Sequence, residues 1–138
     1  MKVLSIKEPY ASLILNGYKH IETRSYKTNY RGEIFIHASK KSINSNLLNP
    51  YVIEISKNIN MNNGHIILKA NLIDCIYMDD KFIDNIKNSN EYKLGMYEIG
   101  RYAWILDNIE AIYPIKANGK LNIWNFDGNY QIKKDTNC

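Results

Sequence analysis

The sequence contains a series of short segments in which apolar and polar residues alternate, the pattern of strands with one buried face. In the second segment, Ile21 and Thr23 fall on one face, whereas Glu22, Arg24 and Tyr26 fall on the other. The segments predicted as strands are residues 3–6, 20–26, 33–39, 65–77, 102–106, 109–115 and 121–126. They predict a mainly antiparallel sheet with short connections.

Helical patterns separate some of these strands. Pro9 suits the first position of a helix, where its missing N–H has no partner to lose, and Gly17 suits the left-handed turn that ends one. We therefore expect a helix over about residues 9–16. Weaker helical patterns occur over residues 46–59 and in a short segment capped by Asp79 or Asp80. About six strands and two or three short helices predict an α+β fold, namely a small, mainly antiparallel β-barrel with helices packed on it.

Length and composition fit one ordinary globular domain. The chain has 138 residues, of which 45% are hydrophobic, so a core can form without disulfides or metal. We expect residues 1–132 to form a single domain and residues 133–138 to form a flexible tail. The net charge of +4 suits an anionic partner without requiring one.

The sequence gives no sign of a metal site, a cofactor or a membrane span. Cys75 and Cys138 are too few for a zinc site without histidine ligands, and the three histidines lack metal-ligand spacing. Cys138 is the last residue and is expected to be mobile. The start of the chain does not have the pattern of a signal peptide, and no apolar run is long enough to span a bilayer. The expectation is a cytoplasmic protein without metal or cofactor.

The most informative charges lie in the run from Gly17 to Arg24, which has the spacing Gly-x-Lys-x-x-Glu-x-Arg. Lys19, Glu22 and Arg24 follow a helix end and alternate with apolar or small residues. This layout predicts a pocket for an anionic or planar polar ligand, such as a nucleotide, in which Lys19 and Arg24 hold a phosphate. The alternative is an ordinary ion pair between neighbouring side chains of a strand.

Several segments, in this order, resemble the ASCH domain of the PUA-like superfamily. They are residues 4–11, 17–26, 31–39, 102–106 and 119–124, so the resemblance covers nearly the whole chain. It implies a small β-barrel with a cleft beside the first helix, lined by Lys19 and Arg24. It also implies binding of RNA, another single-stranded nucleic acid, or a nucleotide or nucleoside with a modified base.

One enzymatic branch of the superfamily hydrolyses the acetyl amide of N4-acetylcytidine with a threonine, a lysine and a glutamate. Its threonine stands three residues after the motif lysine, where this chain has Glu22. A carboxylate is a poor substitute, because attack would give a mixed anhydride, so this activity is not expected here. Two alternatives to a binding module remain open. One is a small hydrolase of a modified nucleoside or RNA with Lys19 and Glu22 in acid/base roles, and the other is an adaptor that binds a protein partner.

Further candidate residues have both a binding and a structural interpretation. Lys7 and Lys40 could extend a phosphate path or be solvated at strand ends, and Ser39 could contact phosphate or local backbone. Tyr26 and Trp104 could stack on a base, although Trp104 in an alternating strand is more typical of core. Tyr10 could form the rim of the cleft or cover the core, and His37 is expected to be structural rather than an acid–base group. The full set of predicted ligand-binding residues is Lys7, Tyr10, Lys19, Glu22, Arg24, Tyr26, Ser39, Lys40 and Trp104.

Overall fold

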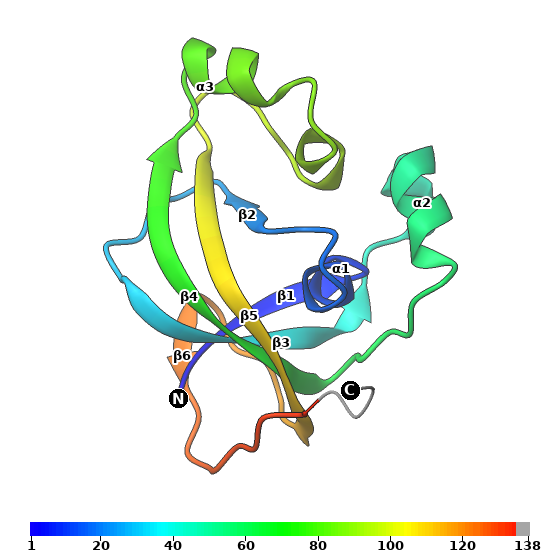
Figure 1. Cartoon of the computed structure of the whole chain (residues 1–138), viewed down its shortest axis with the longest axis vertical. Coiled ribbons are helices and arrows are strands. Elements are labelled where there is room, and N and C mark those ends of the chain that lie inside the picture. Colours follow the sequence, from blue (N-terminus) through cyan, green and yellow to red (C-terminus); the bar gives the residue numbers. More distant parts are fainter. Residues whose placement is uncertain (135–138) are drawn as a thin grey trace.

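The fold consists of one strongly curved sheet with one short helix inside its curve and the other helices at its periphery (Figure 1), as seen in a computed structural model that describes residues 1–134. The strands are β1 (Lys2–Glu8), β2 (Ile21–Arg24), β3 (Gly32–Ser42), β4 (His65–Tyr77), β5 (Tyr102–Lys116) and β6 (Ile123–Asn125). The α-helices are α1 (Tyr10–Leu15), α2 (Pro50–Ser56) and α3 (Asp80–Ile86), and the 3-10 helices are η1 (Ser45–Leu47) and η2 (Glu91–Leu94).

The strands form a single six-stranded sheet in the order β2-β5-β4-β3-β1-β6. All neighbouring pairs are antiparallel except β1 and β3, which run parallel with Ser5 opposite His37. The predicted α+β fold is confirmed. Closure of the barrel is not, because no ladder joins the edge strands β2 and β6 within residues 1–134.

Helix α1 lies against the concave side of the sheet and fills the core. Ala11 and Ile14 are buried there together with Leu4, Ile36 and Trp104, and the helix contacts β1, β3 and β5. Burying these apolar side chains supplies most of the free energy that holds the helix in place, since six residues are too few for a stable isolated helix.

The start of α1 is fixed by a buried carboxylate. Glu8 is fully buried, and its Oε1 accepts a hydrogen bond from the backbone N–H of Ser12 at 2.7 Å. Its Oε2 accepts from the hydroxyl of Ser12 and from the backbone N–H of Asn62, the latter at 2.7 Å. These three donors satisfy a charge that would otherwise be costly to bury, and they tie β1 and α1 to the turn before β4.

The structure departs from the predicted elements in several places, and the helical pattern over residues 46–59 is divided into η1 and the shorter α2. Residues 102–106 and 109–115 are one continuous strand, β5, because Asn108 adopts a left-handed φ of 49° at an irregularity where the ladder with β4 shifts register. Strand β2 ends at Arg24, two residues before the predicted end. The 3-10 helix η2 was not predicted at all.

The end of the chain remains attached to the sheet as far as it is described. Ile132 forms a bridge with Ile112, and the backbone N–H of Lys133 donates to the carbonyl of Ala111 at 2.8 Å. Residues 135–138, including Cys138, lie outside the described residues, so the flexible tail stays a prediction.

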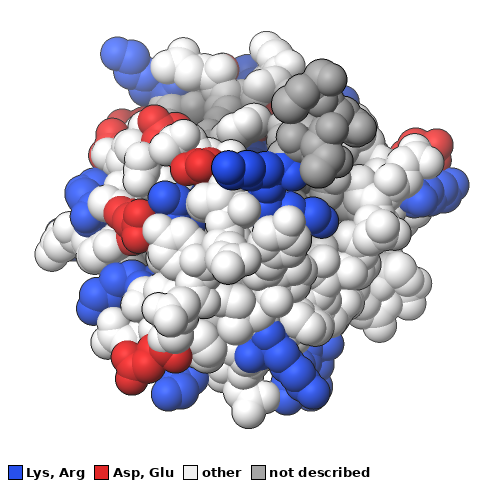
Figure 2. Space-filling view, turned by 60° about the horizontal axis from the view of Figure 1, so that its bottom comes forward, with Lys and Arg blue, Asp and Glu red and all other residues white. Residues whose placement is uncertain are grey.

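Charge is spread over the surface. Figure 2 shows one face on which lysines and arginines surround a broad uncharged area, with most acidic side chains toward its left side. Through residue 134, no helix is long and apolar enough to cross a membrane. In the same part of the chain, no three His, Cys, Asp or Glu side chains are grouped as metal ligands.

Candidate functional site

A cleft opens where the two edges of the curved sheet approach each other. On one side are the end of β2 and the residues after it, and on the other are β1, the end of β3 and the loop of residues 117–122 between β5 and β6. The volume of this cleft, which we call the seam cleft, is about 930 Å³. Its charged lining residues are Lys7, Glu22, Arg24, Lys40, Lys41, Arg101 and Lys120.

The seam cleft is strongly positive. Six of its charged lining residues are cations, and Glu22 is its single carboxylate. Lys7, Lys40, Lys41 and Lys120 form no ion pair with the carboxylates of residues 1–134. Because their charges are not neutralised within the protein, they attract anions to this cleft.

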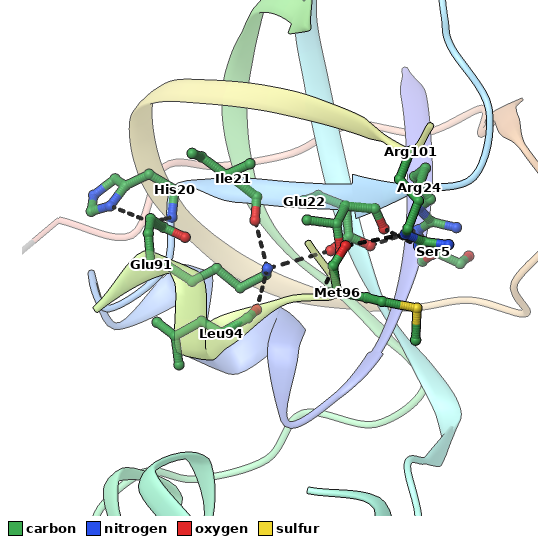
Figure 3. A network of polar contacts seen from close by, with 11 residues as sticks. Ser5, His20, Ile21, Glu22, Arg24, Glu91, Leu94, Met96 and Arg101 are labelled. Atoms are coloured by element: carbon green, nitrogen blue, oxygen red, sulfur yellow. Dashed lines mark hydrogen bonds and ion pairs between the residues drawn. The ribbon is translucent and has the colours of Figure 1, made fainter. Parts of the chain in front are cut away.

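The motif carboxylate Glu22 holds two cations at once (Figure 3). Its Oε1 lies 3.7 Å from Lys19 Nζ, and its Oε2 lies 3.1 Å from Arg24 Nη2. Glu22 is 9% exposed, so these ion pairs are only weakly screened by solvent. The same arginine nitrogen donates to the carbonyl of Ser5 at 2.8 Å, whereas the Arg24 Nε is buried without a hydrogen-bond partner. The guanidinium is therefore fixed in the wall of the cleft.

Lys19 lies behind this wall and does not line the seam cleft. It is 1% exposed, and its Nζ donates to the carbonyls of Ile21 at 2.5 Å and Leu94 at 2.6 Å. Burial lowers the pKa of Lys19, and the nearby carboxylates of Glu22 and Glu91 act in the opposite direction. In this arrangement Lys19 acts on the cleft through Glu22, which it helps to position, and it joins β2 to η2.

The predicted aromatic residues divide between surface and core. Tyr26 lines the cleft and is 37% exposed, whereas Trp104 is buried. Trp104 Nε1 donates to the carbonyl of Tyr26 at 3.1 Å, and the two rings meet edge to face with centroids 5.6 Å apart. Tyr10 is also behind the cleft, with its ring centroid 5.2 Å from Lys19 Nζ. Trp104 thus supports Tyr26, which lines the cleft, whereas Tyr10 packs against Lys19 behind it.

The structure brings most of the predicted ligand-binding residues together. Lys7, Glu22, Arg24, Tyr26, Ser39 and Lys40 line the seam cleft. Tyr10, Lys19 and Trp104 are not among its lining residues. No ligand contact is established for any of the nine, so their binding roles stay predictions.

The floor of the cleft contains a hydrogen-bonded histidine. His37 Nε2 lies 2.8 Å from the carbonyl of Ala117, which can only accept, so Nε2 carries the proton. His37 Nδ1 then accepts from the hydroxyl of Ser5 at 3.0 Å, and Ser5 Oγ accepts from Trp124 Nε1 at 3.1 Å. Burial lowers the pKa of His37. The neutral histidine thus links β3 to Ser5 in β1 and to Ala117 at the start of the 117–122 loop, and Ser5 links it further to Trp124 in β6.

The sequence, compared with known proteins, matches the ASCH domain over residues 4–118. This chain belongs to the ASCH domain family. The resemblance drawn from the motif is thereby confirmed. The chain is 29% identical to activating signal cointegrator 1 from Homo sapiens and to the same protein from Mus musculus. Each alignment covers 90% of this chain but 22% of the relative, so the ASCH domain described here spans about a fifth of those proteins.

Several lining residues of this ASCH domain were not predicted, and four of them matter most for its charge and its apolar surface. They are Lys41 near the end of β3, Arg101 directly before β5, and Lys120 and Leu121 in the loop before β6. The sequence did contain one signal, since the turn at residues 118–119 is followed directly by Lys120 and Leu121. Nothing local to these residues indicates that the folded chain brings them to the motif arginine.

Proposed function

We propose that this ASCH domain binds single-stranded nucleic acid, RNA above all, with one unpaired base in the seam cleft. The observation that supports it most directly is the charge of the cleft, which has six cations and one carboxylate. Phosphate groups are the natural partners of such a surface. Membership of the ASCH domain family is consistent with RNA-related binding.

The size of the cleft favours a single strand over a duplex. Its volume of about 930 Å³ falls within the range of pockets that hold one small ligand. A base within a helix is stacked and paired, and it enters such a cleft only when it is turned out of the stack. A strand with unpaired bases needs no such rearrangement.

Each group of lining residues has a proposed role. Arg24 and the lysines Lys7, Lys40 and Lys120 contact phosphates, since guanidinium and ammonium groups pair readily with phosphate oxygens. Glu22 accepts a hydrogen bond from an exocyclic amine of the base, as carboxylates do with cytosine. Tyr26 provides the stacking surface. Lys19 contributes by holding Glu22 in place.

The experiment that tests this proposal is a fluorescence anisotropy titration of labelled RNA, DNA and duplex oligonucleotides across a range of salt concentrations. We expect the single strands to bind more tightly than the duplexes, with an affinity that falls as salt rises. Replacing one phosphate-contacting lysine in Lys40→Ala or Lys120→Ala should reduce the slope of log K against log salt by about 0.7. The matched control is Lys87→Ala at the end of α3, outside the cleft. Absence of binding, or slopes unchanged in both cleft variants, would contradict the proposal.

The hydrolase alternative requires Lys19 to act as a general base although it is buried. For Lys19 to act as a general base, its Nζ would have to be neutral, and a substrate would have to reach a side chain that is 1% exposed and whose Nζ faces the carbonyls of Ile21 and Leu94. Mass spectrometry of acetylated and methylated nucleosides incubated with the protein tests this alternative. Products formed by the wild type and lost in Lys19→Met and Glu22→Gln, with thermal melting showing that both variants are folded, would establish turnover at this site.

The cytoplasmic location expected from the sequence stays a prediction, because the described structure contains nothing that tests it.

A further inference from the structure

We propose that Leu121 is an apolar wedge that packs against an unpaired base in the seam cleft, so that a strand with bases binds more tightly than its phosphates alone would allow. This inference rests on the proposed function and assigns a role to the 117–122 loop. It makes Leu121 a residue that distinguishes a strand with exposed bases from other polyanions.

Leu121 is almost completely exposed although it lines the cleft. Its exposed fraction is 90%, the largest among the exposed large hydrophobic side chains of residues 1–134. A single exposed leucine is common on protein surfaces and by itself indicates nothing. Its significance here comes from the way in which the loop is held.

The first half of the loop is anchored from both sides. The Ala117 carbonyl accepts from His37 Nε2 at 2.8 Å, and the Ala117 N–H donates to the carbonyl of Gly64 at 3.0 Å. Gly119 packs directly on the floor of the cleft. A Cβ atom there would lie 2.9 Å from Ser5 Oγ and 3.0 Å from His37 Cε1, so only glycine fits this closely.

The second half of the loop is equally constrained. Asn122 has a left-handed φ of 59°, which few residues other than glycine, asparagine and aspartate adopt readily, and β6 begins directly after it. Two residues further on, Trp124 Nε1 donates to Ser5 Oγ at 3.1 Å. With both ends fixed, the intervening Lys120 and Leu121 remain at the solvent-exposed tip. The exposure of Leu121 is thus imposed by the fold, and its side chain is available before any ligand arrives.

The surroundings of Leu121 fit a nucleotide. An apolar tip follows one lysine directly, and the same cleft contains Lys40, Lys41 and Arg101 together with the exposed ring of Tyr26. A nucleotide combines an apolar base face with an anionic phosphate, and apolar side chains such as leucine are known to insert beside bases in this way. A membrane surface also combines apolar and anionic groups. A lining position in a concave cleft suits a strand better than a flat bilayer.

The test compares two exposed leucines. Leu121→Ser removes the proposed wedge, and Leu47→Ser is the matched control, because Leu47 is 78% exposed in η1 and does not line the cleft. Binding of a single-stranded RNA and of an abasic strand of the same length is measured by anisotropy across salt concentrations, with thermal melting as a check on folding. We expect Leu121→Ser to weaken RNA binding about tenfold, within the range for loss of one stacking contact, with an unchanged salt slope. The abasic strand should bind the wild type and Leu121→Ser equally, and Leu47→Ser should behave as the wild type.

The outcomes separate this inference from the proposed function. If the wild-type protein binds no single strand, the proposed function fails and the wedge with it. If it binds with the expected salt dependence but Leu121→Ser binds equally well, the wedge alone is overturned. Equal affinity of the wild type for abasic and natural strands would also overturn the wedge. Leu121-dependent binding to vesicles of anionic phospholipid, without an effect on RNA binding, would replace it by a membrane contact.

Discussion

Arg24 Nη2 donates a hydrogen bond to the backbone carbonyl of Ser5 at 2.8 Å, and this contact joins β2, one edge of the sheet, to β1 beside the other edge. The same nitrogen pairs with Glu22. Arg24 therefore connects β2 to β1 and also forms part of the wall of the seam cleft.

Replacement of Arg24 should affect both stability and binding. In Arg24→Ala the buried Glu22 keeps only Lys19 as an ionic partner, so we expect the free energy of unfolding to fall by about 1–3 kcal/mol. RNA affinity should fall about tenfold or more. Arg24→Lys keeps the charge but loses the planar guanidinium, so its RNA affinity should lie between those of the wild type and Arg24→Ala. Urea denaturation and anisotropy measure these effects, and a variant equal to the wild type in both would contradict the assignment.

Replacement of Lys19 should destabilise the fold in a pH-dependent way. Lys19→Met leaves two carbonyls without a donor and Glu22 without one cation, so we expect a loss of about 3–5 kcal/mol at neutral pH. The folded pKa of Lys19 is below the ordinary 10.5, so unfolding takes up a proton in the range between the two values. The stability of the wild type relative to Lys19→Met should therefore rise with pH toward 10.5. Urea midpoints from pH 8 to 10.5 test this, with Lys87→Met as the control. An unchanged difference between the two proteins would show that Lys19 has its ordinary pKa.

His37 should make the protein less stable in mild acid. Its folded pKa is lowered from 6.5, so the unfolded chain binds a proton in a range where the folded protein does not. Stability is fully present above pH 6.5 and falls as pH decreases toward the folded pKa, by up to about 1.4 kcal/mol for each pH unit. Denaturation between pH 7 and 5 should show this fall in the wild type and in His20→Asn, whose side chain is exposed, but less in His37→Asn. Nitrogen NMR should find the proton of His37 on Nε2, and a proton on Nδ1 at neutral pH would contradict the hydrogen-bond assignment.

The buried carboxylate before α1 should be more important for stability than any surface acid. Glu8→Gln replaces one acceptor oxygen by a donor that faces other donors, so we expect a loss of about 1–3 kcal/mol. Glu54→Gln is the matched control, because the side chain of Glu54 is 73% exposed and pairs only with Lys57. Thermal melting compares the two, and equal effects would show that the Glu8 network contributes little.

The sequence predicted those parts of the fold that depend on local patterns. Alternation located the strands, and Pro9 and Gly17 located α1 to within about one residue at each end. The sequence did not predict that residues 102–106 and 109–115 form one strand. The polar pair Asp107 and Asn108 has the composition of a turn, whereas the ladder with β4 continues past these residues.

The candidate site was predicted less completely, for a physical reason. The motif located Glu22 and Arg24, which line the cleft, and Lys19, which does not. Lys19 is buried because the backbone of Leu94, 75 residues away in sequence, accepts its hydrogen bond. Whether a lysine in a motif meets solvent or backbone depends on such distant partners, and no pattern near Lys19 contains that information.

The gap between the edge strands β2 and β6 affects how easily the seam cleft can widen. A closed barrel changes its diameter only by breaking backbone hydrogen bonds between strands, whereas here the edge strands β2 and β6 share no ladder in residues 1–134. Between β2 and β1, the hydrogen bond from Arg24 to the Ser5 carbonyl resists separation, together with the packing of the core beneath the cleft. Widening the cleft therefore breaks side-chain contacts and need not break the ladders of the six-stranded sheet, so we expect the cleft to accommodate ligands of different thickness without unfolding a strand.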